Sequence, residues 1–257
     1  MIDPRAVVDP SARLASDVTV GPFSIIGAEV EIDAGTWIGP HVVIQGPTRI
    51  GRDNRIFQFA SLGEMPQDKK YGGEPTRLEI GDRNTIREFV TINRGTVQDA
   101  ACTRLGDDNW IMAYVHIAHD CWVGNRAIFA NGASLAGHVR VEDDVGLGGF
   151  ALVYQFTRLG MHSFCGFACG VHRDVPPYVT VAGYRAEPYG INAEGLRRRA
   201  FSDEEIKAIR RAYKVIYRAN LRLEEAVEQV RAMTADWPRL QILADFLAAP
   251  SRNGIVR

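Results

Sequence analysis

A six-residue period runs through roughly the first two thirds of the chain. Every sixth position from residue 8 is aliphatic: Val8, Leu14, Val20, Ile26, Ile32, Ile38, Ile44, Ile50, Ile56 and Leu62. The pattern resumes at Ile80, Ile86 and Ile92, then continues one residue out of phase from Leu105 to Val171, often with a glycine next. This period fits neither an α-helix nor simple strand alternation, but it is the hexapeptide signature of a parallel β-helix.

A hexapeptide repeat predicts short strands joined by tight turns, with three flat sides per coil of about 18 residues. The repeated aliphatic side chain fills the interior, and adjacent coils pair about 4.8 Å apart. Residues 18 apart are therefore expected to stack. The sequence predicts a mainly β fold, with a parallel β-helix domain over residues 1–184.

Two interruptions break the repeat. The segment GEMPQDKKYGGEPTRLE, residues 63–79, is expected to leave the prism and return in phase. The segment NRGTVQDAACTR, residues 93–104, shifts the phase by one residue and is expected to protrude. Loops on a rigid scaffold often carry function.

The repeat ends near residue 185, where helical patterns begin. Ser202 followed by Glu205 predicts a capping box at the start of an amphipathic helix, and further helices are expected over about 221–234 and 237–248. Residues 185–257 are therefore predicted to form a C-terminal α-helical domain.

Composition restricts the classes of partner. The formal charge of the 257 residues is -1, which gives no general attraction to nucleic acid or to anionic membranes. No apolar run is long enough to span a bilayer and the N-terminus lacks a signal-peptide pattern, so we expect a cytoplasmic protein without stable membrane insertion. The four cysteines have no C-x-x-C spacing, which favours buried free thiols.

The stretch YVHIAHDCWVG, residues 114–124, carries the strongest chemical signal. His119 and Asp120 follow the inward Ile117 by two and three residues, which places them at an outer corner. Steps of 18 lead from His119 to Gly137 and Gln155, and from Asp120 to His138. We predict that these side chains form one patch on successive coils, with His116 close by.

The residue types in this patch fit general base catalysis. A carboxylate beside a histidine fixes its tautomer and supports the imidazolium that forms, and a backbone N–H at a glycine can stabilise an oxyanion. Two further interpretations remain open from the residues alone. The histidines can be solvated surface groups, or His116, His119 and His138 can supply three nitrogens to zinc.

The chain also resembles the UDP-N-acetylglucosamine acyltransferases of lipid A biosynthesis along its whole length. The resemblance rests on MIDP, QFASLGEMPQDKKYGGEPTRLEIGDRNTIRE, HIAHDCWVGN, LAGHV, DVPPY and GINAEGLRRRAFS. It implies a left-handed β-helix and a homotrimer with active sites between subunits. It further implies transfer of a 3-hydroxyacyl chain from acyl carrier protein to the glucosamine 3-hydroxyl of UDP-N-acetylglucosamine, with no metal and no cofactor beyond the carrier's thioester.

The resemblance assigns roles to individual residues. It implies His119 as general base, Asp120 as its support and Gly137 as oxyanion donor. Sugar and phosphate binding would fall to Asp68, Lys70, His116, His138 and Gln155. The nucleotide would be held by Asn192, Glu194, Arg198 and Arg199, although LRRRAF alone is equally typical of a solvated basic helix start.

Two positions depart from the family pattern, which has histidine where this chain has Asn93 and Tyr154. Such changes around the acceptor leave a 3-amino UDP-sugar open as the substrate, with an amide as the product. The same β-helix can also serve as a zinc carbonic anhydrase, or as a scaffold without activity.

Two further expectations concern the acyl donor. Phe167 stands where long-chain members resemble one another in having glycine, which implies a preference for about ten to twelve carbons, although a position two after the inward Cys165 can face either way. The acidic carrier protein is expected to dock on basic residues of the C-terminal helices: Arg210, Arg211, Lys214, Arg218 and Arg222.

Overall fold

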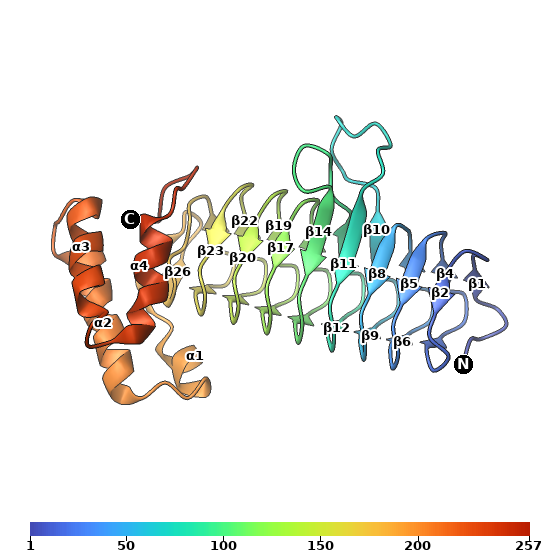
Figure 1. Ribbon diagram of the computed structural model, residues 1–257, viewed down its shortest axis with the longest axis horizontal. Helices are drawn as coiled ribbons and strands as arrows, with labels where there is room; N and C mark the ends of the chain where they lie inside the picture. Colours follow the sequence, from blue (N-terminus) through green and yellow to red (C-terminus); the bar gives the residue numbers. More distant parts are fainter.

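The computed structural model describes all 257 residues as a long three-sided prism with helices at one end (Figure 1). The first side is a nine-stranded sheet of β1 (Val7–Val8), β4 (Ile25–Ile26), β7 (Val43–Ile44), β10 (Ser61–Glu64), β13 (Thr91–Asn93), β16 (His116–Ile117), β19 (Ser134–Leu135), β22 (Leu152–Val153) and β25 (Gly170–Val171). The second side is an eight-stranded sheet of β2 (Arg13–Leu14), β5 (Val30–Ile32), β8 (Thr48–Ile50), β11 (Arg77–Ile80), β14 (Cys102–Leu105), β17 (Trp122–Val123), β20 (Arg140–Val141) and β23 (Arg158–Leu159).

The third side is a ten-stranded sheet that joins the prism to the C-terminal segment. It contains β3 (Thr19–Val20), β6 (Trp37–Ile38), β9 (Arg55–Ile56), β12 (Thr85–Ile86), β15 (Trp110–Ile111), β18 (Ile128–Phe129), β21 (Gly146–Leu147), β24 (Phe164–Cys165), β26 (Val179–Ala182) and β27 (Glu187–Ile191). All pairings in the three sheets are parallel except that of β26 with β27. The predicted parallel β-helix of hexapeptide repeats is confirmed.

Stacking follows the 18-residue step wherever the repeat is unbroken. Ile117 pairs with Leu135, and Leu135 pairs with Val153. These inward aliphatic residues belong to one continuous buried cluster along the prism axis. The interior is therefore a single apolar column, and polar groups of the repeat are left to the corners.

Both interruptions leave the prism at the same corner, between the first and second sides, which we call the loop corner. Ile80 pairs with Ile50 although 30 residues separate them, and Leu105 pairs with Ile80 across 25 residues. The extra residues project as two loops, 65–76 between β10 and β11 and 94–101 between β13 and β14, on adjacent coils (Figure 1).

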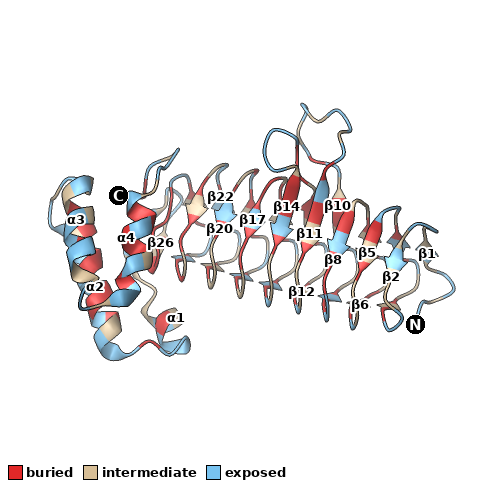
Figure 2. Ribbon diagram, in the orientation of Figure 1, coloured by how far each residue is buried: buried red, intermediate tan, exposed pale blue.

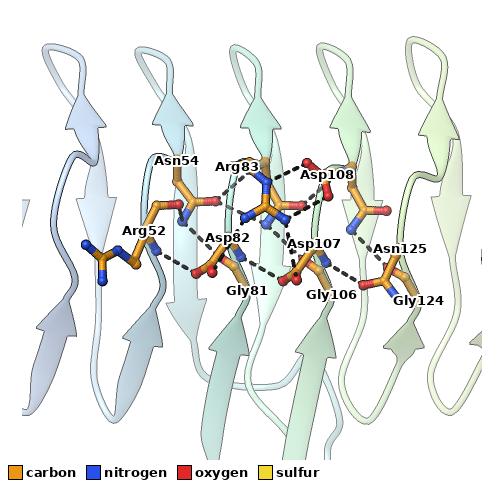
Figure 3. A network of polar contacts seen from close by, with 12 residues as sticks. Arg52, Asn54, Gly81, Asp82, Arg83, Gly106, Asp107, Asp108, Gly124 and Asn125 are labelled. Atoms are coloured by element: carbon orange, nitrogen blue, oxygen red, sulfur yellow. Dashed lines mark hydrogen bonds and ion pairs between the residues drawn. The ribbon is translucent and has the colours of Figure 1, made fainter.

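The corner between the second and third sides shows why glycine recurs in the repeat (Figure 3). The backbone N–H of Asp82 donates to Asp107 Oδ1 at 2.9 Å, and the N–H of Asp107 donates to Asn125 Oδ1 at 2.8 Å. A Cβ on Gly81 would lie 2.1 Å from Asp107 Oδ1, so this ladder requires glycine before the polar residue. The ladder fixes the spacing of the coils.

A second column of side chains lines the corner between the third and first sides. Five rings stack along it with centroids 4.8 to 5.3 Å apart, from residues whose φ is positive: Phe23, His41, Phe59, Phe89 and Tyr114. Stacking of the rings offsets the backbone cost of the left-handed conformation at these turns.

The C-terminal segment forms four α-helices and a 3₁₀ turn at one end of the prism (Figure 1). The helices are α1 (Ala193–Arg198), α2 (Asp203–Arg218), α3 (Leu223–Met233) and α4 (Gln241–Ala248), with η1 (Pro238–Leu240) before α4. The capping box at Ser202 and Glu205 is confirmed. Buried and exposed stripes alternate around α2, as its amphipathic pattern predicts (Figure 2).

None of the helices has the length and apolar character needed to cross a bilayer. All four cysteines are free and buried, as the sequence predicts.

Candidate active site

His119 and Asp120 lie together in the loop corner. His119 Nδ1 is 2.9 Å from Asp120 Oδ2, and the Asp120 side chain is completely buried. Asp120 has a φ of 57°, a turn conformation that aspartate adopts more readily than most residues. The corner therefore turns His119 outward while it holds the carboxylate underneath the imidazole.

The second loop secures this carboxylate. Thr96 donates its backbone N–H to Asp120 Oδ1 at 2.8 Å and its hydroxyl to Asp120 Oδ2 at 2.6 Å. Burial alone would raise the pKa of the Asp120 carboxyl, but the hydrogen bonds from His119 and Thr96 outweigh burial and lower that pKa. Asp120 is thus an anion at neutral pH and can stabilise a positive charge on His119.

Gly137 lies one coil beyond His119, directly against its ring. A Cβ at this position would lie 2.6 Å from His119 Cε1 and 2.7 Å from Nε2. The N–H of Gly137 donates to no acceptor in the protein, because this corner position lies outside the sheet ladder. The glycine therefore gives the imidazole its space and leaves a free amide beside it.

A second histidine and carboxylate pair faces the first. His138 Nδ1 is 2.9 Å from Asp99 Oδ2 in the second loop and 3.9 Å from Asp120 Oδ2. The His138 ring meets His119 edge-on and stacks on Phe156. The sequence did not indicate Asp99 or Thr96, because both lie within the inserted loop 94–101, where the 18-residue step does not apply.

An open cleft of about 740 Å³ lies above these groups. Both loops and the C-terminal Arg252 form its walls. Five of the predicted residues line it: Asp68, Lys70, His119, His138 and Gln155. The cleft is thus polar, and the first loop adds the carboxylate of Asp68 and the ammonium groups of Lys69 and Lys70 to its lining.

His116 lies outside this cleft. Its Nδ1 is 2.7 Å from Thr91 Oγ1, and burial, together with nearby His119, lowers its pKa. The three ligand atoms that gather within 4.8 Å come from His119, Asp120 and His138, so the three-histidine set expected for a zinc centre is not assembled. Asp120 Oδ2 also already accepts hydrogen bonds from both His119 and Thr96.

The residues expected to hold a nucleotide lie in a different hollow of about 680 Å³ on the third side. Asn192, Glu194, Arg198 and Arg199 line it with outward residues of that sheet such as Gly146. In a three-sided prism this side faces away from the loop corner. One chain therefore does not bring these four residues to His119.

Contacts within this hollow fix two of the four residues. Arg199 Nη2 is 3.0 Å from Asp144 Oδ1, so this arginine is not simply a solvated helix residue. Asn192 caps α1 by accepting from the Gly195 N–H and donates to the His162 carbonyl oxygen. Asp144 also pairs with Arg126, and the sequence reasoning missed both residues because no motif singles them out.

The remaining predicted positions are spread over the prism. Phe167 faces outward, with 75% of its surface exposed, and its ring meets Phe150 edge-on. Asn93 is buried and donates to the Met65 carbonyl oxygen, which ties the first loop to the prism. Tyr154 is exposed beside Gln155, with its ring 6.5 Å from that of His172.

Comparisons with known proteins show which family the chain resembles. The family model described as UDP N-acetylglucosamine O-acyltransferase, domain 2, matches residues 174–256, and the bacterial transferase hexapeptide model matches residues 102–137. The acyl-[acyl-carrier-protein]--UDP-N-acetylglucosamine O-acyltransferase of Herminiimonas arsenicoxydans is 60% identical over 100% of this chain and 99% of its own length. The enzyme of the same name from Halorhodospira halophila is 61% identical with the same coverage.

The chain belongs to the UDP-N-acetylglucosamine acyltransferase family. A solved member of the family, the UDP-N-acetylglucosamine acyltransferase of Francisella novicida, superposes with a TM-score of 0.97 at 43% identity, covering 100% of this chain and 94% of that one. A match this close extends over the β-helix and the C-terminal helices together. It confirms the fold class that the resemblance implied, a left-handed β-helix with a helical C-terminal domain.

Proposed function

We infer that this protein is an acyl-[acyl-carrier-protein]--UDP-N-acetylglucosamine O-acyltransferase, which moves a 3-hydroxyacyl chain to the glucosamine 3-hydroxyl in lipid A biosynthesis. The observation that carries the inference is the buried Asp120 carboxylate beneath His119, in a chain that matches full-length members of the family. The three-histidine set that a zinc carbonic anhydrase would require is not assembled, since His116 is not among the ligand atoms that gather at His119, Asp120 and His138.

The geometry supports a direct transfer. His119 Nε2 removes the proton of the sugar hydroxyl while the hydroxyl oxygen attacks the thioester carbonyl carbon. Asp120 stabilises the imidazolium, and the free N–H of Gly137 donates to the oxyanion that forms. Collapse of the intermediate releases the carrier's thiolate, which recovers the proton from His119.

The function is tested with purified protein, a 3-hydroxyacyl carrier protein and UDP-N-acetylglucosamine. We expect a monoacylated nucleotide sugar whose acyl group is released by mild alkali, because the bond formed is an ester. An alkali-stable product formed only from a 3-amino sugar would instead favour amide formation. Absence of transfer to either sugar would refute the assignment.

We further propose that the active unit is a homotrimer with each site shared between two subunits. The support is geometric, because the loop corner with His119 and the hollow with Arg199 lie on opposite parts of one prism. In this arrangement Asn192, Glu194, Arg198 and Arg199 of one subunit hold the nucleotide. Asp68, Lys70, His138 and Gln155 of the next hold the sugar and its phosphates beside His119, whereas His116 lies outside the cleft and contacts Thr91.

Shared sites predict complementation between inactive variants. We expect His119→Ala and Arg199→Ala proteins to be nearly inactive alone and to recover activity when co-expressed, because some sites in mixed trimers then have both residues intact. The measurement is kcat of the co-purified mixture against each single variant. Mixed trimers without recovered activity would place both residues of a site in the same chain.

Phe167 is proposed to limit the length of the acyl chain. Its exposed ring lies at the edge of the third side, where a neighbouring subunit would enclose an apolar channel. A rigid wall cannot yield to a longer chain, and each excluded methylene loses about 0.8 kcal/mol of transfer free energy.

We expect the wild type to prefer acyl chains of about ten to twelve carbons over fourteen, and Phe167→Gly to shift the preference toward fourteen. The measurement is kcat/KM for a series of 3-hydroxyacyl carrier proteins, with Phe150→Gly as a control for loss of an exposed ring nearby. A wild-type optimum at the longest chain, or an unchanged profile in the variant, would contradict the role of Phe167.

We also propose that the enzyme works in the cytoplasm without nucleic acid and without a cofactor. The thioester already activates the acyl group, so a base and an oxyanion donor are sufficient for the reaction. Four free buried thiols are typical of a reducing compartment.

A further inference from the structure

A buried carboxylate lies between two arginines in the hollow on the third side. The Asp144 side chain is only 6% exposed, and its Oδ1 is 3.0 Å from Nη2 of Arg199. Arg126 binds both carboxylate oxygens, with Nε 3.0 Å from Oδ1 and Nη2 2.9 Å from Oδ2. Asp144 and Arg126 belong to successive coils of the prism, whereas Arg199 follows α1. One carboxylate therefore connects the C-terminal segment to the prism.

Asp144 is itself held on several sides. It lies in the turn between β20 and β21, where its backbone N–H donates to the Asn125 carbonyl oxygen at 2.9 Å. Arg126 is fixed in turn by Asp143, whose Oδ2 is 2.9 Å from Nη2. His162 Nδ1 is 3.9 Å from Asp144 Oδ2, but burial lowers the pKa of His162 and keeps its ring neutral at neutral pH. The two arginines are therefore the cations that share the charge of Asp144.

Arg199 uses one of its three guanidinium nitrogens in these contacts. Nη2 faces Asp144 and donates to the Arg126 carbonyl oxygen at 3.4 Å, whereas Nε and Nη1 make no hydrogen bond or ion pair within the chain. The adjacent Arg198 is different, because its side chain is 77% exposed and pairs only with Glu194 of the same helix. Arg199 thus combines a fixed orientation with free N–H donors in the hollow.

The charge of Asp144 is what keeps Arg199 in this orientation. Arg126 and Arg199 approach the same carboxylate, so without that charge two guanidinium groups would repel each other at short range. The Arg199 side chain, 39% exposed, would then turn toward solvent and gain rotamer freedom. A ligand would have to order the side chain again as it binds, and this lowers affinity.

We propose that Asp144 is a positioning residue for the nucleotide, which fixes Arg199 before UDP-N-acetylglucosamine binds. Nε and Nη1 of Arg199 then donate to oxygen atoms of the nucleotide without a rearrangement of the side chain. The inference rests on the proposed binding of the nucleotide by Arg199. It adds a residue that acts through Arg199 and does not itself contact the substrate.

Calorimetric titration with UDP measures this role without the transfer reaction. Asp144→Asn removes the charge but keeps an oxygen acceptor for Arg126, so the fold should be retained. Its affinity for UDP should fall about tenfold, the effect of losing one charge-assisted hydrogen bond at a partly exposed site. KM for UDP-N-acetylglucosamine should rise by a similar factor while kcat stays close to that of the wild type, because Asp144 contacts no reacting group.

The matched control is Asp143→Asn. It makes the same change at the adjacent residue, which also binds Arg126 but does not contact Arg199. This variant should bind UDP as tightly as the wild type. An equal loss of affinity in both variants would mean that the two carboxylates only support the fold of this corner, and would overturn the role of Asp144.

A double-mutant cycle tests whether Asp144 acts through Arg199. In the Arg199→Ala background, Asp144→Asn should cause no further loss of UDP affinity. Additive losses, or equal affinities of the wild type and Asp144→Asn, would refute the proposal while the nucleotide site stands. A wild type without affinity for UDP would instead refute the nucleotide site itself, and the role of Asp144 with it.

Discussion

Replacing His119 by alanine is expected to lower kcat by about two to four orders of magnitude, the range for removal of a positioned general base. The imidazole is the group in the cleft whose Nδ1 is bound to a buried carboxylate, which leaves Nε2 free for the sugar hydroxyl. KM for the nucleotide sugar should change much less, because Asp68, Lys70 and the nucleotide hollow remain. Steady-state rates with saturating donor measure both quantities.

His116→Ala is the matched control for this experiment. It removes the same side chain three residues earlier, from a position that contacts Thr91 and lies outside the cleft. Its kcat should fall by less than tenfold, and both variants should keep the wild-type oligomeric state. Near-wild-type kcat in His119→Ala would exclude this residue as the base.

Much of the catalytic corner follows from the period of the repeat. Because the coil takes 18 residues, the sequence places Gly137 and Gln155 in line with His119 and His138 in line with Asp120, and the strand register agrees. Because the inward positions are aliphatic, the polar side chains of the site lie at a corner of the prism.

Other parts of the site were beyond sequence reasoning for physical reasons. Thr96 and Asp99 belong to an insertion, and the conformation of an inserted loop depends on packing that no period encodes. The nucleotide residues presented a different difficulty. Residue spacing along one chain cannot indicate a site that two chains share, which is the arrangement proposed above. Arg199 was therefore predicted from the resemblance alone, and it lies far around the prism from His119.

Gly137→Ala is expected to lower kcat by about a hundredfold through a single added methyl group. The new Cβ would meet the His119 ring at 2.6 to 2.7 Å, closer than real contacts allow. The ring cannot keep its bond to Asp120 and also make room, because the carboxylate is held in place by Thr96. Displacement of a catalytic group by about 1 Å has effects of this size.

Gly190→Ala, in β27, provides the control. It makes the same chemical change as Gly137→Ala, but a Cβ at position 190 would meet no atom within 4 Å. Gly190→Ala should retain wild-type kcat. In Gly137→Ala the strained hydrogen bond to Asp120 should lower the free energy of unfolding by about 1 to 3 kcal/mol, which leaves the fold intact at assay temperature. The measurements are kcat and denaturant unfolding of both variants. Wild-type kcat in Gly137→Ala would mean that the corner relaxes, and the close fit between glycine and imidazole would then have no part in catalysis.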